Sequence, residues 1–284
     1  MMSEPAIEMN SRDRQTADAF ATSWNHLPSG SVYSTAQFED WFAPLERSDL
    51  EGKRVLELGC GNGSLLTHVT AWRPEYLTGV DLGASVDSCR ENMKRTTFQN
   101  YEVVQDDLAT FFRTGGFDVV YCIGVLHHLK DPLSGFASVI RNTKRGGRFH
   151  CWVYAKEGNA IIRYVVDPIR KVASRLPWWF TKYLIATPLA VPFYFYAHLV
   201  SGKKIFHRFP LHEYCNWIVR RPFAFFRHVA FDQLVTPQTA YIDKATIGRW
   251  LAAFPEIDPE SVYVIFRNGN SWKFGGMKRG DSPA

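Results

Sequence analysis

Between residues 53 and 154 the chain alternates short apolar runs with stretches of helical spacing, and this rhythm constrains the fold more than any other feature. The strand-like runs are KRVLELG (53–59), YLTGVD (76–81), YEVVQDD (101–107), FDVVYCIG (117–124) and RFHCWVY (148–154). Helical spacing separates them at 64–72, 83–95 and 131–143. Continuous apolar runs are typical of strands buried on both faces. The alternation therefore predicts right-handed βαβ units around a parallel sheet.

The rhythm stops near Ala155 and resumes near Tyr241. Beyond that point, 243–254 has helical spacing, and 261–278 reads as a hairpin around an RNGN turn. Two strands added to five predict an α/β fold with a doubly wound, mostly parallel, Rossmann-like sheet of seven strands. The last strand is expected to run antiparallel.

Three parts are expected along the chain. Residues 1–50 would form an N-terminal tail, loose to about residue 16, followed by a helical cap. Residues 51–154 and 241–284 would together form the core, and 155–240 a large, mainly helical insertion that serves as a substrate lid. Hydrophobic residues make up 46% and charged residues 21% of the chain, which is typical of a globular protein.

The cysteines and the N-terminus bear on where the protein works. Five cysteines are present, an odd number without a CxxC pair, which argues against a disulfide framework and against a zinc site. The sequence has no obvious cluster of metal ligands. Residues 1–15 are polar and lack the apolar stretch of a signal peptide. A reduced, cytoplasmic setting is therefore expected.

The segment VLELGCGNGSLL (55–66) places Gly59, Gly61 and Gly63 in a sharp turn between a strand and a helix. Glycine permits unusual backbone angles there and lets a ligand approach the main chain closely. The helix that begins near Ser64 offers free N–H groups to that ligand. Dinucleotide-binding folds also have such a turn, so the turn alone does not identify the ligand.

The spacing of the glycines and the nearby carboxylates separates these possibilities. A dinucleotide site has the pattern GxGxxG, whereas this chain has GCGNG without a third glycine at the expected place. Glu57, inside the strand, would repel a phosphate but suits a ligand with an amino group and a sulfonium. Asp81 ends the second strand, where it can accept hydrogen bonds from both ribose hydroxyls. Asp106 and Asp107 end the third strand, where one of them can meet an adenine amino group.

Further motifs follow in order: GVD (79–81), QDD (105–107), FDVVYCIGVLHHLKDP (117–132) and KRGG (144–147). Together with VLELGCGNG they resemble the successive motifs of class I S-adenosylmethionine-dependent methyltransferases. The chain is similar to the small-molecule type, as in quinone biosynthesis. The resemblance covers 51–154 well, 241–284 loosely and 155–240 hardly at all. It implies S-adenosyl-L-methionine as the methyl donor and leaves the substrate open.

By position, the resemblance implies a set of cofactor-binding residues in and after the first four strands: Glu57, Gly59, Cys60, Gly61, Asn62, Gly63, Asp81, Leu82, Asp106, Asp107, Leu108 and Ile123. The glycine turn would hold the methionine part of the cofactor, and Asp81 the ribose. Leu82 would lie against the adenine, and Asp107, in preference to Asp106, would meet its amino group. Leu108 would donate from its backbone, and Ile123 would lie beneath the cofactor. Cys60 is interpreted as a packing residue and not as a nucleophile.

The resemblance also implies that His127 and His128 face the transferred methyl group or the substrate. An oxygen nucleophile of high pKa would need a base, and histidine titrates near neutrality. These two residues are the catalytic candidates, although a histidine in LHHL is equally typical of a packed core. Tyr154, Tyr241 and Trp250 are candidates for the substrate side.

The insertion at 155–240 is basic and aromatic. It holds 12 Lys and Arg against 4 Asp and Glu, so its charge is +8 in a chain whose total is +5. Its aromatic residues concentrate at 176–200 and 203–231. They could be buried under a lid, line a pocket for a bulky apolar substrate, or lie on an anionic membrane through 176–231. The first run is long enough to span a bilayer, but three prolines, Lys182 and its place inside a cytoplasmic fold argue against a transmembrane helix.

The sequence thus predicts a methyltransferase for a small hydrophobic or phenolic metabolite, with membrane association left open. An RNA-modifying methyltransferase is an alternative, since basic and aromatic residues can bind phosphates and stack on bases. The fourth strand, however, ends in CIGVLHH and lacks the NPPY signature used for base amines, so a nucleic-acid partner is not expected. A cofactor-binding protein without transferase activity would have the same motifs. A dehydrogenase is disfavoured by the glycine spacing.

Overall fold

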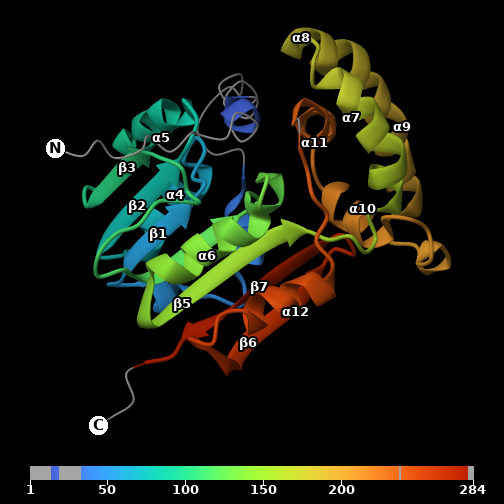
Figure 1. Cartoon of the computed structure of the whole chain (residues 1–284). Helices are drawn as coiled ribbons and strands as arrows, with labels where there is room; N and C mark the ends of the chain where they lie inside the picture. The colour runs from blue at the N-terminus through green and yellow to red at the C-terminus, as the bar shows by residue number, and fades with distance from the viewer. Residues whose placement is uncertain (1–13, 19–32, 237, 281–284) are drawn as a thin grey trace.

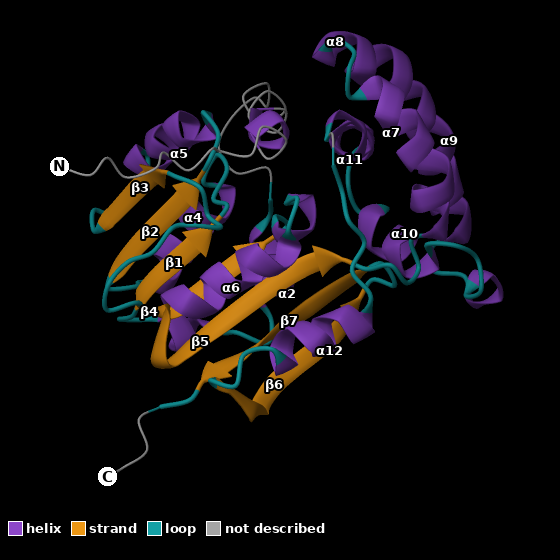
Figure 2. Ribbon diagram, in the orientation of Figure 1, coloured by secondary structure: helices purple, strands orange, loops and turns teal. Residues whose placement is uncertain are grey.

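The computed structural model describes residues 14–18, 33–236 and 238–280. Figures 1 and 2 show a twisted sheet covered by helices, with a second group of helices standing beside one end of it. The strands are β1 (Arg54–Leu58), β2 (Tyr76–Asp81), β3 (Tyr101–Gln105), β4 (Phe117–Ile123), β5 (Thr143–Tyr154), β6 (Ile257–Arg267) and β7 (Ser271–Lys278). They form one sheet in the order β3-β2-β1-β4-β5-β7-β6.

The first five strands are parallel, and β7 runs antiparallel between β5 and β6. The predicted seven-stranded, mostly parallel sheet with an antiparallel last strand is confirmed. One boundary differs, because β5 begins at Thr143 and not near Arg148. The ladder is irregular there, and Gly146 has φ +72°. A glycine pair at such an irregularity hides the start of the strand from the apolar pattern.

Helices cover both faces of the sheet and bury alternate residues of each strand. On one face lie α2 (Thr35–Phe42), α3 (Arg47–Leu50), α4 (Ser64–Val69) with the 3₁₀ turn η1 (Thr70–Trp72), and α5 (Ser85–Lys94). On the other lie η2 (Leu126–His128), α6 (Pro132–Asn142) and α12 (Lys244–Ala252). Val55 faces the first group, whereas Leu56 and Leu58 face the second. Glu57 therefore lies on the same face as Val55.

Two segments of the predicted N-terminal part fall within the described residues. Residues 14–18 are helical, so the expectation of a loose tail is wrong for 14–16; the rest of that tail lies outside the described residues. In α2 the Ser34 side chain accepts a hydrogen bond from the Gln37 N–H, which caps the helix. Phe38 and Phe42 of this helix are fully buried against the sheet.

Between β5 and α12 the chain leaves the sheet and forms a series of helical segments. They are η3 (Ile162–Val166), α7 (Asp167–Ala173), α8 (Trp178–Phe180), η4 (Thr181–Ala186), α9 (Thr187–Val200), η5 (Lys204–Phe206), α10 (His212–Ile218) and α11 (Phe223–Val235). α11 lies between the others and buries Phe226, Phe231 and Leu234 against them. These helices have two apolar clusters of their own. Figure 1 shows that the arrowhead of β5 points toward this group.

Backbone hydrogen bonds hold both ends of the insertion on the sheet. The Lys156 N–H donates to the Ile242 carbonyl at 3.1 Å, which joins its two ends. The Ala240 N–H donates to the His127 carbonyl at 2.7 Å. The insertion is thus fixed next to the loop that follows β4, at the carboxyl edge of the sheet.

Candidate active site

The order of the strands places the glycine turn where an α/β sheet usually binds its ligand. The chain reverses its winding between the neighbouring strands β1 and β4, and ligands bind at the carboxyl ends of strands at such a point. Gly59 has φ +84°, and a Cβ there would lie 2.4 Å from Val125 Cγ2. At Gly61 (φ +52°) an added Cβ would meet nothing within 4 Å. The backbone of the turn is thus unobstructed by a side chain at Gly61 and faces open space there.

Asp81 fastens the end of β2 to this turn. Its Oδ2 accepts from the Gly61 N–H at 2.9 Å, and its Oδ1 accepts from the Gly83 N–H at 2.9 Å and from the Ser85 hydroxyl at 3.2 Å. Burial raises the pKa of Asp81, and the hydrogen bonds oppose this effect. The carboxylate is therefore held in one orientation at the edge of the sheet.

Glu57 is the second carboxylate of this edge, and only 2% of it is exposed. The Tyr121 hydroxyl, from the paired position on β4, donates to its Oε2 at 3.0 Å. Burial raises the pKa of Glu57 to about 8, although the Tyr121 hydrogen bond lowers it. A cation beside this carboxylate would stabilise its ionised form.

The loop after β3 separates the two neighbouring aspartates. Asp107 and Leu108 line a cavity together with Asp81, Leu82 and Ile123. Asp106 is exposed, is not among the described lining residues, and accepts the Asp107 N–H on its Oδ1 at 2.7 Å. The geometry thus favours Asp107, as the sequence did.

The remaining residues of the glycine turn differ in their surroundings. Cys60, Gly61 and Asn62 line the cavity. Gly63 is not among the described lining residues, and a Cβ there would lie 2.6 Å from Cys89 Sγ, so this glycine lets α4 and α5 pack closely. The pKa of the Cys60 thiol is raised, first by its hydrogen bond with Cys89 and also by burial. A neutral, buried thiol agrees with packing and not with nucleophilic chemistry.

One continuous cavity of about 490 Å³ extends from this edge beneath the insertion. On the sheet side its wall includes Glu57, Gly61 and Asp81. On the far side the wall is mainly aromatic and apolar, with Leu189, Phe193, Tyr214, Trp217, Phe225, Phe226 and Val229 from α9, α10 and α11. The two regions share one space, although more than 100 residues separate their sequences.

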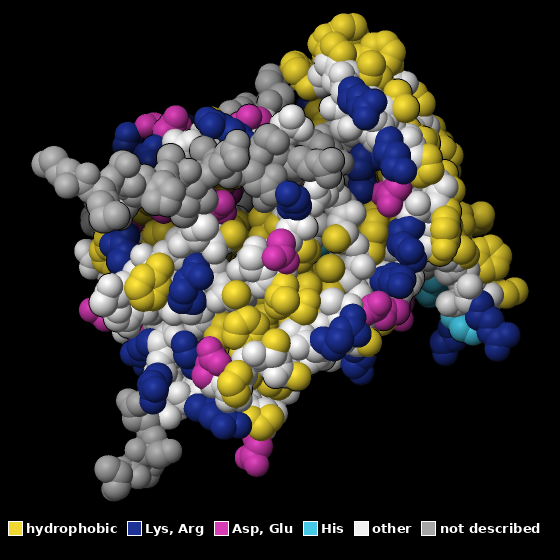
Figure 3. Space-filling view, viewed as in Figure 1, with side chains coloured by type: hydrophobic (Ala, Val, Ile, Leu, Met, Phe, Trp, Pro, Cys, Tyr) yellow, Lys and Arg dark blue, Asp and Glu magenta, His cyan; other side chains and the backbone are white. Residues whose placement is uncertain are grey.

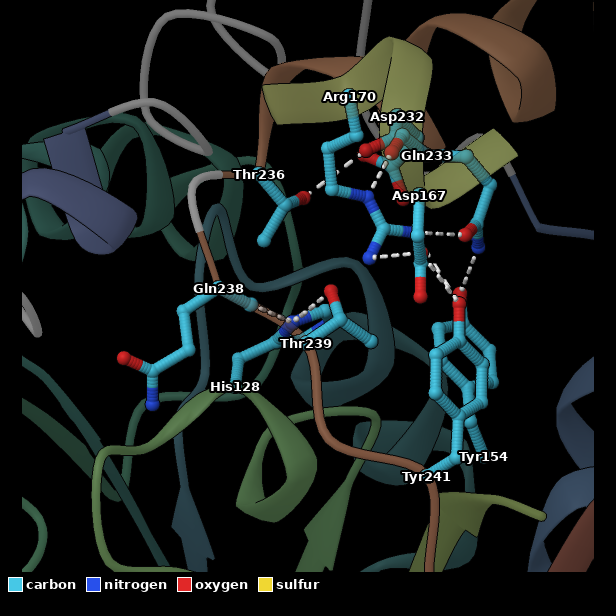
Figure 4. Close-up of polar contacts among 10 residues, drawn as sticks. All are labelled: His128, Tyr154, Asp167, Arg170, Asp232, Gln233, Thr236, Gln238, Thr239 and Tyr241. Carbon is cyan, nitrogen blue, oxygen red and sulfur yellow. Dashed lines mark hydrogen bonds and ion pairs between the residues drawn. The ribbon is translucent and has the colours of Figure 1, made fainter. Parts of the chain in front are cut away.

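A polar cluster interrupts the apolar wall. Arg170 of α7 is only 4% exposed, and its Nη1 lies 2.8 Å from Asp167 Oδ1. Its Nη2 donates to Gln233 Oε1 at 2.8 Å and to the Tyr241 hydroxyl at 3.3 Å. The Gln233 amide donates to the Tyr154 hydroxyl at 2.8 Å. Figure 4 shows the hydroxyls of Tyr154 and Tyr241 directed toward this cluster.

Asp232 lies next to the cluster and also lines the cavity. Its Oδ1 is buried without a hydrogen-bond partner among the described residues. Burial raises the pKa of Asp232 to about 7, although Arg170 lowers it. Burial raises the pKa values of Tyr33, Tyr154 and Tyr214, and the Asp232 carboxylate adds to this effect. Tyr33 lines the same cavity as Glu57 and Asp232.

The two predicted catalytic histidines occupy different positions. His127 is fully buried, is not among the described lining residues of the cavity, and has its ring centroid 4.2 Å from that of Tyr154, with the two planes tilted by 46°. His128 does line the cavity, and its Nδ1 donates to the Gln238 carbonyl at 3.0 Å. Burial lowers the pKa of His127, and it lowers the pKa of His128 to about 4. Both rings are therefore neutral near pH 7, and His128 helps to hold the returning end of the insertion.

The three candidates for the substrate side also separate. Tyr154 and Tyr241 line the cavity, with ring centroids 6.3 Å apart. The placement of Trp250 on the substrate side is wrong, because this residue is buried in the core and stacks on Phe136 at 6.0 Å. Its helix is amphipathic, and an aromatic residue on the buried face looks the same in sequence whether it meets a core or a pocket.

Sequence reasoning missed the groups that the insertion contributes, namely Arg170, Asp232, Gln233 and Tyr214. One signal was available for Asp232, since it is one of only 4 acidic residues in the basic insertion and lies in the apolar run FAFFRHVAFDQLV. A carboxylate in such a run is rarely buried without a reason. The other three residues carry no local signal.

Comparisons with known proteins agree with this geometry. Residues 56–149 match the family model described as a methyltransferase domain. The ubiquinone biosynthesis O-methyltransferase of Pseudomonas syringae is 34% identical over 106 residues, which cover 36% of this chain and 45% of that protein. The Pseudomonas aeruginosa protein of the same name is 34% identical over 105 residues, again covering 45% of its length. This chain spans less than half the length of these curated relatives.

A solved structure resembles this protein in fold over nearly the whole chain, including most of the insertion. The magnesium protoporphyrin IX methyltransferase of Synechocystis PCC 6803, solved with bound S-adenosylhomocysteine, superimposes with a TM-score of 0.55 at 13% identity. The match covers 94% of this chain and 97% of that one. Residues 56–149 form a class I S-adenosylmethionine-dependent methyltransferase domain.

The methyltransferase domain has S-adenosylmethionine as its cofactor, and the residues at the sheet edge fit that molecule. The backbone at Gly61 faces open space that a Cβ would fill. The Asp81 carboxylate is fixed at the end of β2, and the buried Glu57 carboxylate borders the same cavity. The uncharged main chain of the glycine turn, with carboxylates beside it, suits a nucleoside that carries positive charge.

Proposed function

We propose that this protein transfers the methyl group of S-adenosylmethionine to a hydroxyl oxygen of a bulky, mainly apolar small molecule, such as an alkylated phenol. The observation that carries the proposal is the single cavity that joins the glycine turn to the aromatic wall of the insertion. An acceptor in the aromatic part would have its reactive end directed toward the sheet edge. Such alignment of two reactants can supply about 7–11 kcal/mol of the barrier reduction.

Each side of the cavity has a distinct task under this proposal. The backbone of Gly59 to Gly61, together with Glu57, Asp81 and Asp107, would hold the cofactor, which supplies an electrophilic methyl group when bound. Phe193, Tyr214, Trp217 and Phe226 would enclose the acceptor and exclude water. A closed apolar chamber selects for shape and apolar area, which is how a wall without many hydrogen-bonding groups discriminates between substrates.

Asp232 is the residue that we assign to accept the proton of the acceptor hydroxyl. It borders the cavity, and burial brings its pKa to about 7, so the ionised form is available near neutral pH. His128 borders the same cavity but has its pKa lowered to about 4, which makes it the weaker base. The prediction that His127 or His128 acts in catalysis remains a prediction, and His128 is the competitor to Asp232.

The relatives support an oxygen acceptor. Two of them are named ubiquinone biosynthesis O-methyltransferases. The mainly apolar wall also favours an apolar small molecule over RNA, whose phosphates would require a basic channel.

The proposal is tested by binding first and by turnover second. Calorimetric titration should show binding of S-adenosylhomocysteine and none of NAD; binding of NAD alone would refute the cofactor assignment. Methyl transfer is then measured with labelled S-adenosylmethionine on phenols that carry alkyl chains of increasing length. We expect kcat/KM to rise with chain length. Cofactor binding without transfer to any member of the series would favour a binding protein without transferase activity.

A further inference from the structure

The exposed apolar side chains of this protein are concentrated on the insertion. Thirteen of the seventeen exposed large hydrophobic residues in the described part of the chain lie between residues 161 and 209. We call eight of them the outer arm face: Val172, Leu176, Trp179, Tyr183, Leu184, Val191, Phe195 and Leu199. Large exposed apolar patches are rare on soluble monomers and usually mark an interaction site.

Six of the eight residues of the outer arm face lie on one continuous helix, and Val172 and Leu176 precede it. The segments α8, η4 and α9 run without a break from Trp178 to Val200, a length and composition that could also cross a membrane. Trp179, Tyr183, Val191, Phe195 and Leu199 are all exposed and recur at intervals of four or eight residues. The wide π-helical turns of η4 offset the drift that this spacing has in an α-helix, so the five side chains share one side. At 1.5 Å per residue this side extends over about 30 Å.

The other side of this helix is packed against the rest of the insertion. Ala186, Ala190, Ala197 and Val200 are buried, and they contribute to the clusters that surround α11 and α10. These small residues let the helices approach closely, whereas Val191, Phe195 and Leu199 of the same helix are exposed. The burial of one side argues for a helix that lies along a surface and against one that is surrounded by lipid.

The charges are arranged at the two ends of the outer arm face. Between Leu176 and Gly202 the only charged residue is Lys182, and its ammonium lies over the rings of Trp178 and Phe231 at 5.8 and 5.7 Å. The exposed cations Lys171 and Arg175 precede this stretch, and Lys203, Lys204 and Arg208 follow it. Figure 3 shows hydrophobic side chains along the outer edge over α8 and α9, with Lys and Arg side chains beside them.

This combination matches the interface of an anionic lipid bilayer. An apolar strip without charge can enter the acyl boundary, while lysines and arginines at its ends meet the headgroups. Each such cation near an anionic surface contributes about 1 kcal/mol, or roughly a fivefold gain in binding. The basic ends of the strip complement anionic headgroups, whereas a second copy of this chain on the same face would bring like charges together.

The cavity opens on the same group of helices. Ile161, just before η3, and Val165, near the end of η3, both line the cavity and are exposed. They lie a few residues before Val172, where the outer arm face begins. An apolar acceptor held in a bilayer would thus reach the cavity close to the point of membrane contact.

We propose that the outer arm face docks this protein onto anionic membranes, with the helix from Trp178 to Val200 lying in the plane of the interface. This inference goes beyond the proposed function and does not depend on it, because lipid binding needs neither cofactor nor acceptor. The two can therefore fail separately.

The test is flotation with vesicles of phosphatidylcholine, alone or mixed with phosphatidylglycerol. We expect the protein to float with the anionic vesicles, and high salt to weaken binding because it screens the headgroup charge. Phe195→Glu with Leu199→Glu should lower the affinity at least tenfold. Lys203→Gln with Lys204→Gln should lower it about thirtyfold, from two lost cations.

The matched control is Phe112→Glu with Leu133→Glu, which places the same two charges at exposed apolar residues of the sheet domain (56% and 40% exposed, against 68% and 55% for Phe195 and Leu199). It should leave vesicle binding unchanged. S-adenosylhomocysteine titration of every variant reports whether the fold is retained. Equal loss in the control, or no flotation of the wild type, would overturn the proposal. So would resistance to extraction by alkaline carbonate, which indicates a spanning helix, or a wild-type dimer that Phe195→Glu converts to a monomer, which indicates a second copy on this face.

Discussion

The two walls of the cavity differ in the groups that form them and in what fixes the positions of those groups. The sheet-edge wall includes main chain of the glycine turn and acidic side chains at or near the carboxyl ends of β1, β2 and β3. Each of these groups takes its position from its own strand. The insertion wall consists of large side chains from α9, α10 and α11, whose positions depend on how those helices pack on one another. The first wall suits a ligand common to many enzymes, and the second suits an acceptor particular to this one. Specificity is thus expected to change with the insertion alone.

Glu57 on one wall and Asp232 on the other are carboxylates whose pKa burial raises to about 8 and about 7, and the two differ in their surroundings. Glu57 has the Tyr121 hydroxyl as its partner and a pKa of about 8. Asp232 has Arg170 nearby and a pKa of about 7, and one of its oxygens has no partner among the described residues. The first is suited to receive a fixed cation, and the second to receive a proton. This difference can be tested residue by residue.

The largest effect is expected from Asp232→Asn, which removes the assigned base. We expect kcat to fall about 10²- to 10⁴-fold, with the affinity for S-adenosylhomocysteine unchanged. Asp232 accepts a proton only when ionised, so the wild-type rate should fall as the pH falls below about 7. The variant should lack this limb of the profile. Arg170 lowers the pKa of this carboxylate, and Asp232 in turn adds to the burial that raises the pKa values of Tyr33, Tyr154 and Tyr214.

His128→Asn is the comparison that could reverse this assignment. If the rate and its pH dependence are lost in His128→Asn and kept in Asp232→Asn, the proton goes to the loop after β4 and not to the insertion. A small change in His128→Asn with an intact pH profile would agree with its role in holding the Gln238 carbonyl.

The next effect is expected at the opposite wall. Asp81→Ala removes three hydrogen bonds to the Gly61 and Gly83 N–H groups and to the Ser85 hydroxyl. We expect calorimetry to show about 100-fold weaker binding of S-adenosylhomocysteine, or about 2.7 kcal/mol. The matched control is Asp106→Ala, which removes an exposed aspartate outside the cavity lining. Equal losses in both variants would mean that the β2 edge does not hold the cofactor.

These two walls also differ in how far the sequence could foretell them. The sheet edge was predictable, because a strand is a local pattern and the residue at its end, such as Asp81, takes its position from the strand. Asp232 was not, because its partners Arg170 and Tyr154 lie about 60 and 80 residues earlier in the chain. Trp250 failed for a related reason: its helix was predicted, but the surface that the helix covers depends on tertiary packing.

A smaller effect on KM should distinguish the side of the insertion that lines the cavity from the side that is exposed to solvent. Phe193→Ala shortens a side chain that lines the cavity, whereas Phe195→Ala, two residues along α9, changes one that is exposed. Lost contact with an apolar acceptor is worth about 1–3 kcal/mol, so we expect KM for long-chain phenols to rise about tenfold in Phe193→Ala. It should stay unchanged in Phe195→Ala when the assay contains no lipid. Equal KM values in the two variants would place the acceptor elsewhere.

The smallest effect expected is the release of a fraction of a proton when S-adenosylhomocysteine binds. With a pKa of about 8, Glu57 is largely protonated near neutral pH in the free protein. A cationic amino group bound beside it would lower this pKa, so binding of S-adenosylhomocysteine should release a proton from Glu57. Calorimetry at one pH in buffers of different ionisation enthalpy measures that release. Glu57→Gln keeps the size and the neutral charge of the protonated side chain and should abolish the release. Undiminished proton release in Glu57→Gln would assign it to another group and leave this buried carboxyl a structural partner of Tyr121.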